Sequence, residues 1–99
     1  MNKFLKQSSN SEFAKEIVTK ALTYLANEPQ IFSRFLSLTG LEPDEIRSQV
    51  NFNTFQSAVL EFLLSDEALL LTFCSNCAID PMSIKAAYHA ISQDQHQDQ

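Results

Sequence analysis

Apolar residues recur along the chain at the three-to-four-residue spacing of amphipathic helices. The first apolar face is formed by five residues, Phe13, Ile17, Ala21, Tyr24 and Leu25. Ser9, with Glu12 three residues later, fits the capping box that begins such a helix. Pro29 suits the first turn of a second helix, and Gly40 suits the left-handed position after its end. The pattern therefore predicts one helix before Pro29 and a second between Pro29 and Gly40.

The same signals continue to the end of the chain. Pro43 with two acidic residues begins a short third helix, and later starts fall at Asn53, Asp66 and Pro81. The inward positions of these helices are apolar: Ile46, Val50, Phe55, Val59, Phe62, Leu63, Ile84, Tyr88 and Ile91. The chain has one glycine, whereas a β-rich domain of this size needs several for its hairpins and bulges. We therefore predict an all-α fold, a compact bundle of five to six short helices.

The two ends of the chain differ from its middle in composition. Residues 1–8 hold few apolar side chains and are predicted to be a flexible N-terminus. Residues 93–99 are polar and low in complexity, so they cannot bury apolar surface and are predicted to be a disordered tail. Between them, residues 9–92 are predicted to form a single helical domain.

A shift of 38 residues places the second part of the chain over the first. The two halves cover about residues 13–50 and 53–91, and their helix starts, prolines and core positions coincide. The matched pairs include Leu25 with Leu63, Phe35 with Phe73, Gly40 with Ala78, Pro43 with Pro81, and Ile46 with Ile84. Exact identity is low, so the counts alone leave chance similarity as the alternative. We predict two tandem related three-helix halves with pseudo-twofold symmetry.

Charge and hydropathy narrow the classes of partner. The chain has seven Lys and Arg against twelve Asp and Glu, a net charge of −5, and no cluster of basic residues. A nucleic-acid-binding protein usually carries such a cluster, so we expect no nucleic-acid partner. No stretch approaches the apolar run that a secretory signal or a membrane span needs. We expect a cytoplasmic protein with no membrane association.

Cys74 and Cys77 form the pair CSNC, a spacing found in zinc and redox sites. With His89 and His96 the zinc pattern would be C-x2-C-x11-H-x6-H, whose second spacing is too long for a zinc finger. A redox pair needs the start of a helix, where the dipole lowers a thiol pKa, and this pair falls at a predicted helix end. We therefore predict cysteines that pack in the core, with no metal and no cofactor.

The sequence holds no recognisable catalytic arrangement. The carboxylate pairs Asp44-Glu45 and Asp66-Glu67 both fall at helix starts, where acidic residues are common. There is no glycine-rich phosphate loop, and no motif places a serine, histidine or lysine beside these pairs. We expect a non-enzymatic protein with no catalytic and no cofactor-binding residues.

The segment ALLLTFC, residues 68–74, is apolar nearly all round. A helix of this kind is buried centrally or presents a face to a partner, and we favour central burial. Under the 38-residue shift, three bulky apolar residues of the second half, Leu64, Leu71 and Met82, lie over Ala26, Ser33 and Asp44. If these residues are exposed, they form a candidate interaction patch. The main functional prediction is a small protein–protein interaction module that binds an unknown protein or a second copy of itself.

An alternative function comes from the segment LTGLEPDEIR, residues 38–47. Gly40, Leu41 and Ile46 fall at the turn and packing positions of a helix-turn-helix. Leu36, however, stands where that motif has a small residue, and the next helix starts with acidic residues where phosphates would lie. A divergent helix-turn-helix DNA-binding regulator is therefore the second functional interpretation, and an ordinary helix cap followed by a proline-started helix explains the segment better.

Three motifs together carry a family resemblance: FLSLTGL at residues 35–41, DEALLLTFC at 66–74 and the Asp-Pro pair at 80–81. With them the chain resembles a family of short, uncharacterised proteobacterial proteins that is filed as a domain of unknown function. The resemblance covers about residues 13–90. Members typically have glycine or alanine near Ser65 and lack the cysteine pair, so the CSNC of this chain is a local variation. The family implies a small, cytoplasmic, helical bacterial protein and brings no activity, cofactor or partner.

Overall fold

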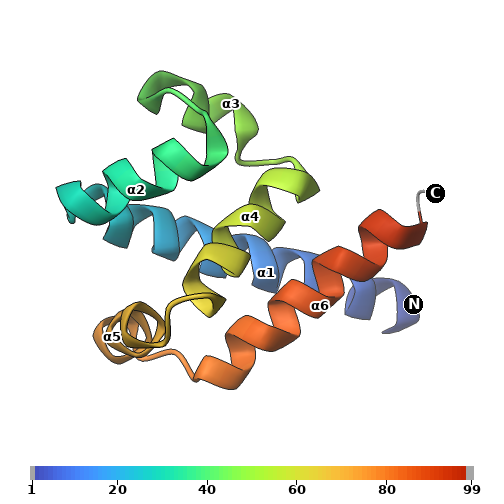
Figure 1. The fold of residues 1–99 in the computed structure, drawn as a ribbon. Coiled ribbons are helices and arrows are strands. Elements are labelled where there is room, and N and C mark those ends of the chain that lie inside the picture. Colours follow the sequence, from blue (N-terminus) through green and yellow to red (C-terminus); the bar gives the residue numbers. More distant parts are fainter. Residues whose placement is uncertain (1, 98–99) are drawn as a thin grey trace.

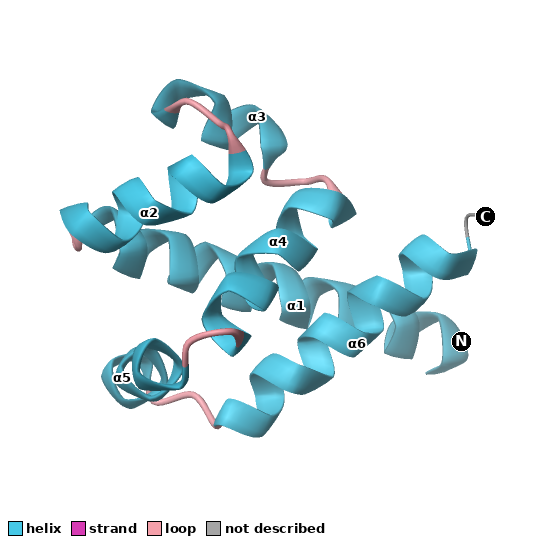
Figure 2. Cartoon of the chain, in the orientation of Figure 1, coloured by secondary structure: helices cyan, strands magenta, loops and turns pink. Residues whose placement is uncertain are grey.

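The computed structural model of the chain describes residues 2–97, with side chains described for residues 12–92. A 3-10 turn, η1, covers Pro43–Glu45. The six helices are α1 Asn2–Ala26, α2 Pro29–Thr39, α3 Ile46–Gln49, α4 Asn53–Leu64, α5 Glu67–Cys77 and α6 Pro81–Gln97 (Figure 1). Residues 2–97 contain no strand (Figure 2). The prediction of an all-α bundle of five to six helices is confirmed.

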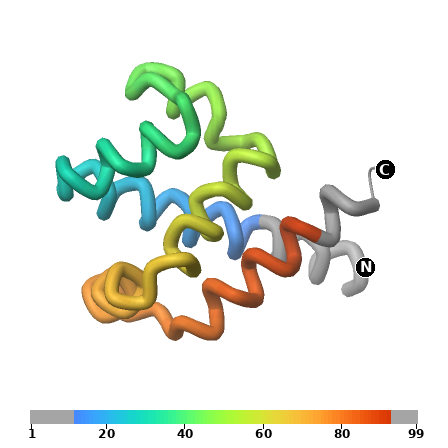
Figure 3. Tube along the Cα trace, viewed as in Figure 1, coloured from blue at the N-terminus to red at the C-terminus, as the bar shows by residue number. Residues whose placement is uncertain are grey.

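The helices are arranged around α4, which lies at the centre of the bundle (Figure 3). α4 packs against α1, α5 and α6, and α1 in turn packs against α2 and α6. η1 and α3 lie at one end of the bundle beyond α2, while α5 lies at the other end beside the start of α6 (Figure 1). The radius of gyration is 13.5 Å, close to the ~13 Å expected of a compact domain of this length.

One apolar core joins these helices. Its largest fully buried side chains come from five helices: Val18, Leu25, Phe35, Val59, Leu60, Leu63, Phe73 and Ile84. Aromatic rings meet across it, since Phe35 lies 5.3 Å from Phe62 and 6.0 Å from Phe55 between ring centroids. Tyr24 meets Phe73 in the same way at 5.6 Å. Tilted ring pairs of this kind stabilise a core beyond the burial of their area.

Two apolar residues of the first two helices are exposed, and the helical pattern had placed one of them, Phe13, inward. Phe13 is 42% exposed, because the inward stripe of α1 is formed by its neighbours Ala14, Ile17, Val18, Ala21 and Leu25. Leu38 is 71% exposed, because the inward face of α2 is already formed by Ile31, Phe32, Phe35 and Leu36. The periodicity therefore gives the correct helices but places the Phe13 side chain on the wrong face.

One helix start and the form of the third helix also differ from the prediction. α1 begins at Asn2, so Ser9 lies inside the helix and does not cap it. The third helix is divided into η1 and a four-residue α3, because the start at Pro43 is tightened into a 3-10 turn. Residues 1–8 and 93–99 were predicted to be flexible. Their side chains, and the backbone of residues 1, 98 and 99, lie outside the described part of the chain. That expectation and the domain limits at 9–92 stay predictions.

Two helices end in the left-handed conformation. Gly40 follows α2 with φ 76°, and its N–H donates to the Leu36 carbonyl at 2.8 Å. Ala78 follows α5 with φ 56°, and the N–H of Ile79 donates to the Cys74 carbonyl at 2.9 Å. Left-handed φ is free of steric cost for glycine, whereas it strains a residue with a Cβ. Ala78 is the only non-glycine residue with positive φ in the described chain.

The two caps predict stability changes of opposite sign. Ala78→Gly should stabilise the protein by about 0.5–1 kcal/mol, since the relieved left-handed strain exceeds the entropic cost of glycine. Gly40→Ala should destabilise it by about the same amount. A Cβ built at Gly40 has no heavy atom within 4 Å, so the effect comes from φ alone. Urea unfolding followed by circular dichroism measures both, and a destabilised Ala78→Gly variant would contradict the strain at Ala78.

Candidate functional site

The predicted interaction patch is only partly exposed. Leu71, in the middle of α5, is 50% exposed, and Met82, the second residue of α6, is 65% exposed. Leu64, the last residue of α4, is half-buried and packs against the core. The structure therefore leaves Leu71 and Met82 available to a partner, while Leu64 mainly supports the bundle from within.

The three consecutive leucines of α5 have different environments. Leu69 and Leu70 are buried with Phe73 and Cys74, whereas Leu71 points to the surface. The prediction that the segment 68–74 is buried centrally is therefore correct for one face of α5 and wrong for Leu71. The exposed residues of α5 are Glu67, Ala68, Leu71, Thr72, Ser75 and Asn76. This outer face of α5 carries one charged residue and has a large apolar side chain at its middle.

The cysteine pair lies at the C-terminal end of α5, as predicted. Cys74 is 4% exposed and belongs to the core, and Cys77 is half-buried against it. Both are free thiols. Burial raises the pKa of the Cys74 thiol, and the negative charges of Asp80 and Cys77 raise it further. Cys74 is thus a packing residue with suppressed thiolate character.

No metal centre is found among the residues whose side chains are described, because they contain no group of three His, Cys, Asp or Glu side chains that could hold an ion. The side chain of His96, the last ligand in the zinc pattern, lies outside the described part of the chain.

The helix-turn-helix segment lacks a recognition helix at the expected place. After Gly40 the chain forms η1 and then α3, which has only four residues. Glu42 and Glu45 cap each other, and the Glu42 N–H donates to Glu45 Oε1 at 2.7 Å. A recognition helix must be long enough to lie in the major groove with its N-terminal residues on the bases. The geometry of α2, η1 and α3 does not meet that requirement.

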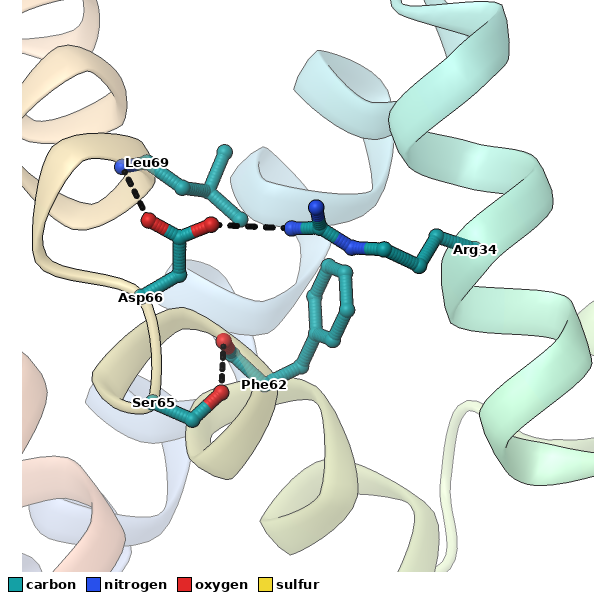
Figure 4. A network of polar contacts seen from close by, with 5 residues as sticks. All are labelled: Arg34, Phe62, Ser65, Asp66 and Leu69. Atoms are coloured by element: carbon teal, nitrogen blue, oxygen red, sulfur yellow. Dashed lines mark hydrogen bonds and ion pairs between the residues drawn. The ribbon is translucent and has the colours of Figure 1, made fainter.

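A polar network that the sequence did not reveal joins α2 to the start of α5 (Figure 4). Arg34 Nη2 donates to Asp66 Oδ2 at 2.9 Å, and the guanidinium lies 5.3 Å from the centroid of the Phe62 ring. Asp66 Oδ1 accepts the backbone N–H of Leu69 at 3.1 Å, which caps α5. The Leu69 N–H and then Arg34 hold the pKa of the Asp66 carboxyl below its ordinary value. Its carboxylate thus joins α2 to the first turn of α5 through one ion pair and one helix-capping hydrogen bond.

A cleft of about 550 Å³ lies between α1, α2 and the η1–α3 segment. Its apolar lining includes Leu22, Phe32, Ile46 and Val50, and Arg47 is the one charged residue among its lining residues. The sequence had placed Ile46 and Val50 inward, but periodicity gives no sign that α3 would stand away from α1. The volume and the mostly apolar lining with few polar groups are typical of small-molecule sites.

Asp66 predicts a specific pH dependence of stability. A carboxyl whose folded pKa is lowered stabilises the protein above its ordinary value of 3.8, and this contribution is lost as the pH falls through the lowered folded pKa. Asp66→Asn keeps a good cap but removes the charge. The stability gap between wild type and this variant should therefore close in acid, as measured by urea unfolding at a series of pH values. Glu67→Gln is the matched control, and an equal pH dependence in both variants would contradict the role of Asp66.

The two thiols should differ in reactivity. Iodoacetamide attacks accessible thiolates, so the half-buried Cys77 should be alkylated faster than Cys74, which is buried and whose pKa is raised by that burial. Asp80→Asn should lower the pKa of Cys74 and shift its alkylation slightly toward neutral pH, because burial remains the larger cause. Peptide mass spectrometry at a series of pH values measures both rates. Equal native rates at the two cysteines would contradict the burial of Cys74.

The helices within residues 2–97 are each too short or too polar to cross a lipid bilayer. No curated protein and no solved structure matches the chain. One family matches residues 11–94, nearly the whole of the chain. This match confirms the resemblance that the FLSLTGL and DEALLLTFC motifs carry. The chain belongs to the family described as Protein of unknown function (DUF3572).

Proposed function

We propose that this chain is a small non-enzymatic interaction module that associates with a second copy of itself through the outer face of α5. The observation that carries the proposal is Leu71, half exposed at the middle of a face on which only Glu67 is charged. The buried centre of an interface is depleted in charged residues and more apolar than its rim, and methionine is enriched there. Met82 lies close to this face along the chain and adds a second exposed apolar side chain.

The charge of the chain favours this face over others for contact between copies. Two copies each carry a net charge of −5 and repel each other at long range. The exposed surface of α1, by contrast, includes Glu12, Lys15, Glu16 and Lys20. A contact between two copies through α1 would place like charges opposite each other unless each lysine of one copy met a glutamate of the other. A contact through the outer face of α5 would bury only one carboxylate from each copy.

The same proposal includes an internal repeat that relates the two halves of the bundle. α2 Pro29–Thr39 and α5 Glu67–Cys77 coincide at both ends under the 38-residue shift. The starts of η1 at Pro43 and of α6 at Pro81 coincide as well. The left-handed caps Gly40 and Ala78 are also 38 residues apart. Agreement at both helix ends and at both caps supports a common unit, because chance similarity does not require the backbone to repeat.

The aromatic contacts support a pseudo-twofold arrangement of the two units. Tyr24 of the first half meets Phe73 of the second at 5.6 Å between ring centroids. The same shift turns Tyr24 into Phe62 and Phe73 into Phe35, and these two meet at 5.3 Å. Reciprocal contacts of this form are what a twofold axis produces between equivalent units. In the repeat, Leu71 of α5 lies over Ser33 of α2, so the large apolar side chain belongs to one unit only.

Size-exclusion chromatography with light scattering tests the proposal under reducing conditions. Wild type should be a dimer, and Leu71→Glu should weaken the dimer roughly 100-fold or more, since it places a charge at the centre of the contact. Leu71→Ser, which copies the first half, is the milder variant. Both should keep the circular dichroism of the wild type because Leu71 lies outside the core.

Ser33→Glu is the matched control, because it adds the same charge at the equivalent exposed position of α2. It should leave the dimer intact. A monomeric wild type, or equal weakening by Ser33→Glu and Leu71→Glu, would overturn self-association through α5. A dimer that the Leu71 variants leave unchanged would place the contact elsewhere.

A further inference from the structure

We propose that the cleft between α1, α2 and α3 binds a small amphiphilic carboxylate, with its apolar chain against the cleft wall and its carboxylate on Arg47. The cleft holds about 550 Å³ and is lined mostly by apolar side chains. Three apolar residues of its lining, Leu22, Phe32 and Ile46, are each only half-buried. An apolar chain in the cleft would remove their remaining exposed surface from water.

The charge at the cleft selects an anion. Of the two arginines in the chain, Arg34 is engaged by Asp66 and lies over the Phe62 ring. Arg47, in contrast, forms no ion pair with any described side chain. A guanidinium binds a carboxylate through two parallel hydrogen bonds, which a single apolar anion can supply.

The other polar groups of the cleft are already occupied. The hydroxyl of Thr19 donates to the Lys15 carbonyl at 2.9 Å, and that of Thr23 donates to the Thr19 carbonyl at 3.1 Å. Each hydroxyl has one proton, so neither has a donor left for a ligand. The cleft therefore combines one available cationic group with apolar walls, which matches a ligand that has one anionic group and an apolar body.

In the second half of the bundle, the region equivalent to the cleft is filled by side chains. The positions equivalent to Leu22, Phe32 and Ile46 are Leu60, Leu70 and Ile84, and all three are buried. There α6 packs directly on α4, whereas α3 and α1 are not closely packed. Half-buried Leu64 packs against the core where exposed Ala26 lines the cleft. The first half thus leaves open a space that side chains fill in the second.

Three ligands with the same chain test the proposal: decanoate, 1-decanol and decyltrimethylammonium, each below its micellar concentration. Isothermal titration calorimetry should detect decanoate, give roughly five-fold weaker binding for 1-decanol, which lacks the charge that pairs with Arg47, and give still weaker binding for decyltrimethylammonium. In ¹⁵N–¹H correlation spectra, decanoate should shift the amides of Leu22, Phe32 and Ile46. Arg47→Ala should weaken decanoate binding roughly five-fold, as expected for a partly solvated ion pair. Ala26→Leu should weaken it roughly ten-fold by filling the cleft.

Lys85→Ala is the matched control, and its choice rests on the proposed repeat. Lys85 lies at the position equivalent to Arg47 and is also exposed. Its replacement by alanine changes the net charge of the protein by the same amount as Arg47→Ala. It should leave decanoate binding unchanged, and the Leu71→Glu monomer should bind as the wild type does. Binding of decanol as tight as that of decanoate would overturn the proposal. So would equal losses in Arg47→Ala and Lys85→Ala, amide shifts confined to α5, or no binding of decanoate.

Discussion

The arrangement of the bundle depends on the ring contacts that Phe35 and Phe73 make in the core. Each is fully buried, and each meets an aromatic ring on a helix of the other half: Phe35 meets Phe62 of α4, and Phe73 meets Tyr24 of α1. Burial of a phenylalanine side chain contributes about 1.5–3 kcal/mol. These two rings therefore fix α2 and α5 across the long helices of the core, and they determine which face of each remains outside.

The two ends of the bundle differ because different elements follow α2 and α5. After α2 the chain has only η1 and the four-residue α3 before α4 begins. After α5 it continues into α6, which has 17 residues and lies along α4 and α1. A long amphipathic helix can cover the apolar faces of two neighbours, whereas a single turn cannot. The short α3 therefore leaves the cleft beside α1 open, whereas the long α6 covers α4.

Prolines, the glycine and apolar periodicity predict most helix boundaries, because they act through local backbone chemistry. They place the starts at Pro29 and Pro81 and the cap at Gly40 correctly. They fail at Leu71, because consecutive residues of a helix lie roughly 100° apart and a run of leucines covers every direction. The inward side of such a run is decided by the crossing of helices in three dimensions. The cleft and the pair of Arg34 with Asp66 depend on the same crossings, so no local pattern indicates them.

The two proposed surfaces lie on helices that one ion pair connects. Arg34 belongs to α2, whose Phe32 lines the cleft, and Asp66 caps α5, which carries Leu71. The side chains of this pair are 52% and 36% exposed, and ion pairs this open to water contribute little to stability. The pair is therefore too weak to transmit a large coupling free energy between the surfaces. The buried contacts of Phe35 and Phe73 hold both helices in place whether or not either surface is occupied, so ligand binding in the cleft and association through α5 should be thermodynamically independent.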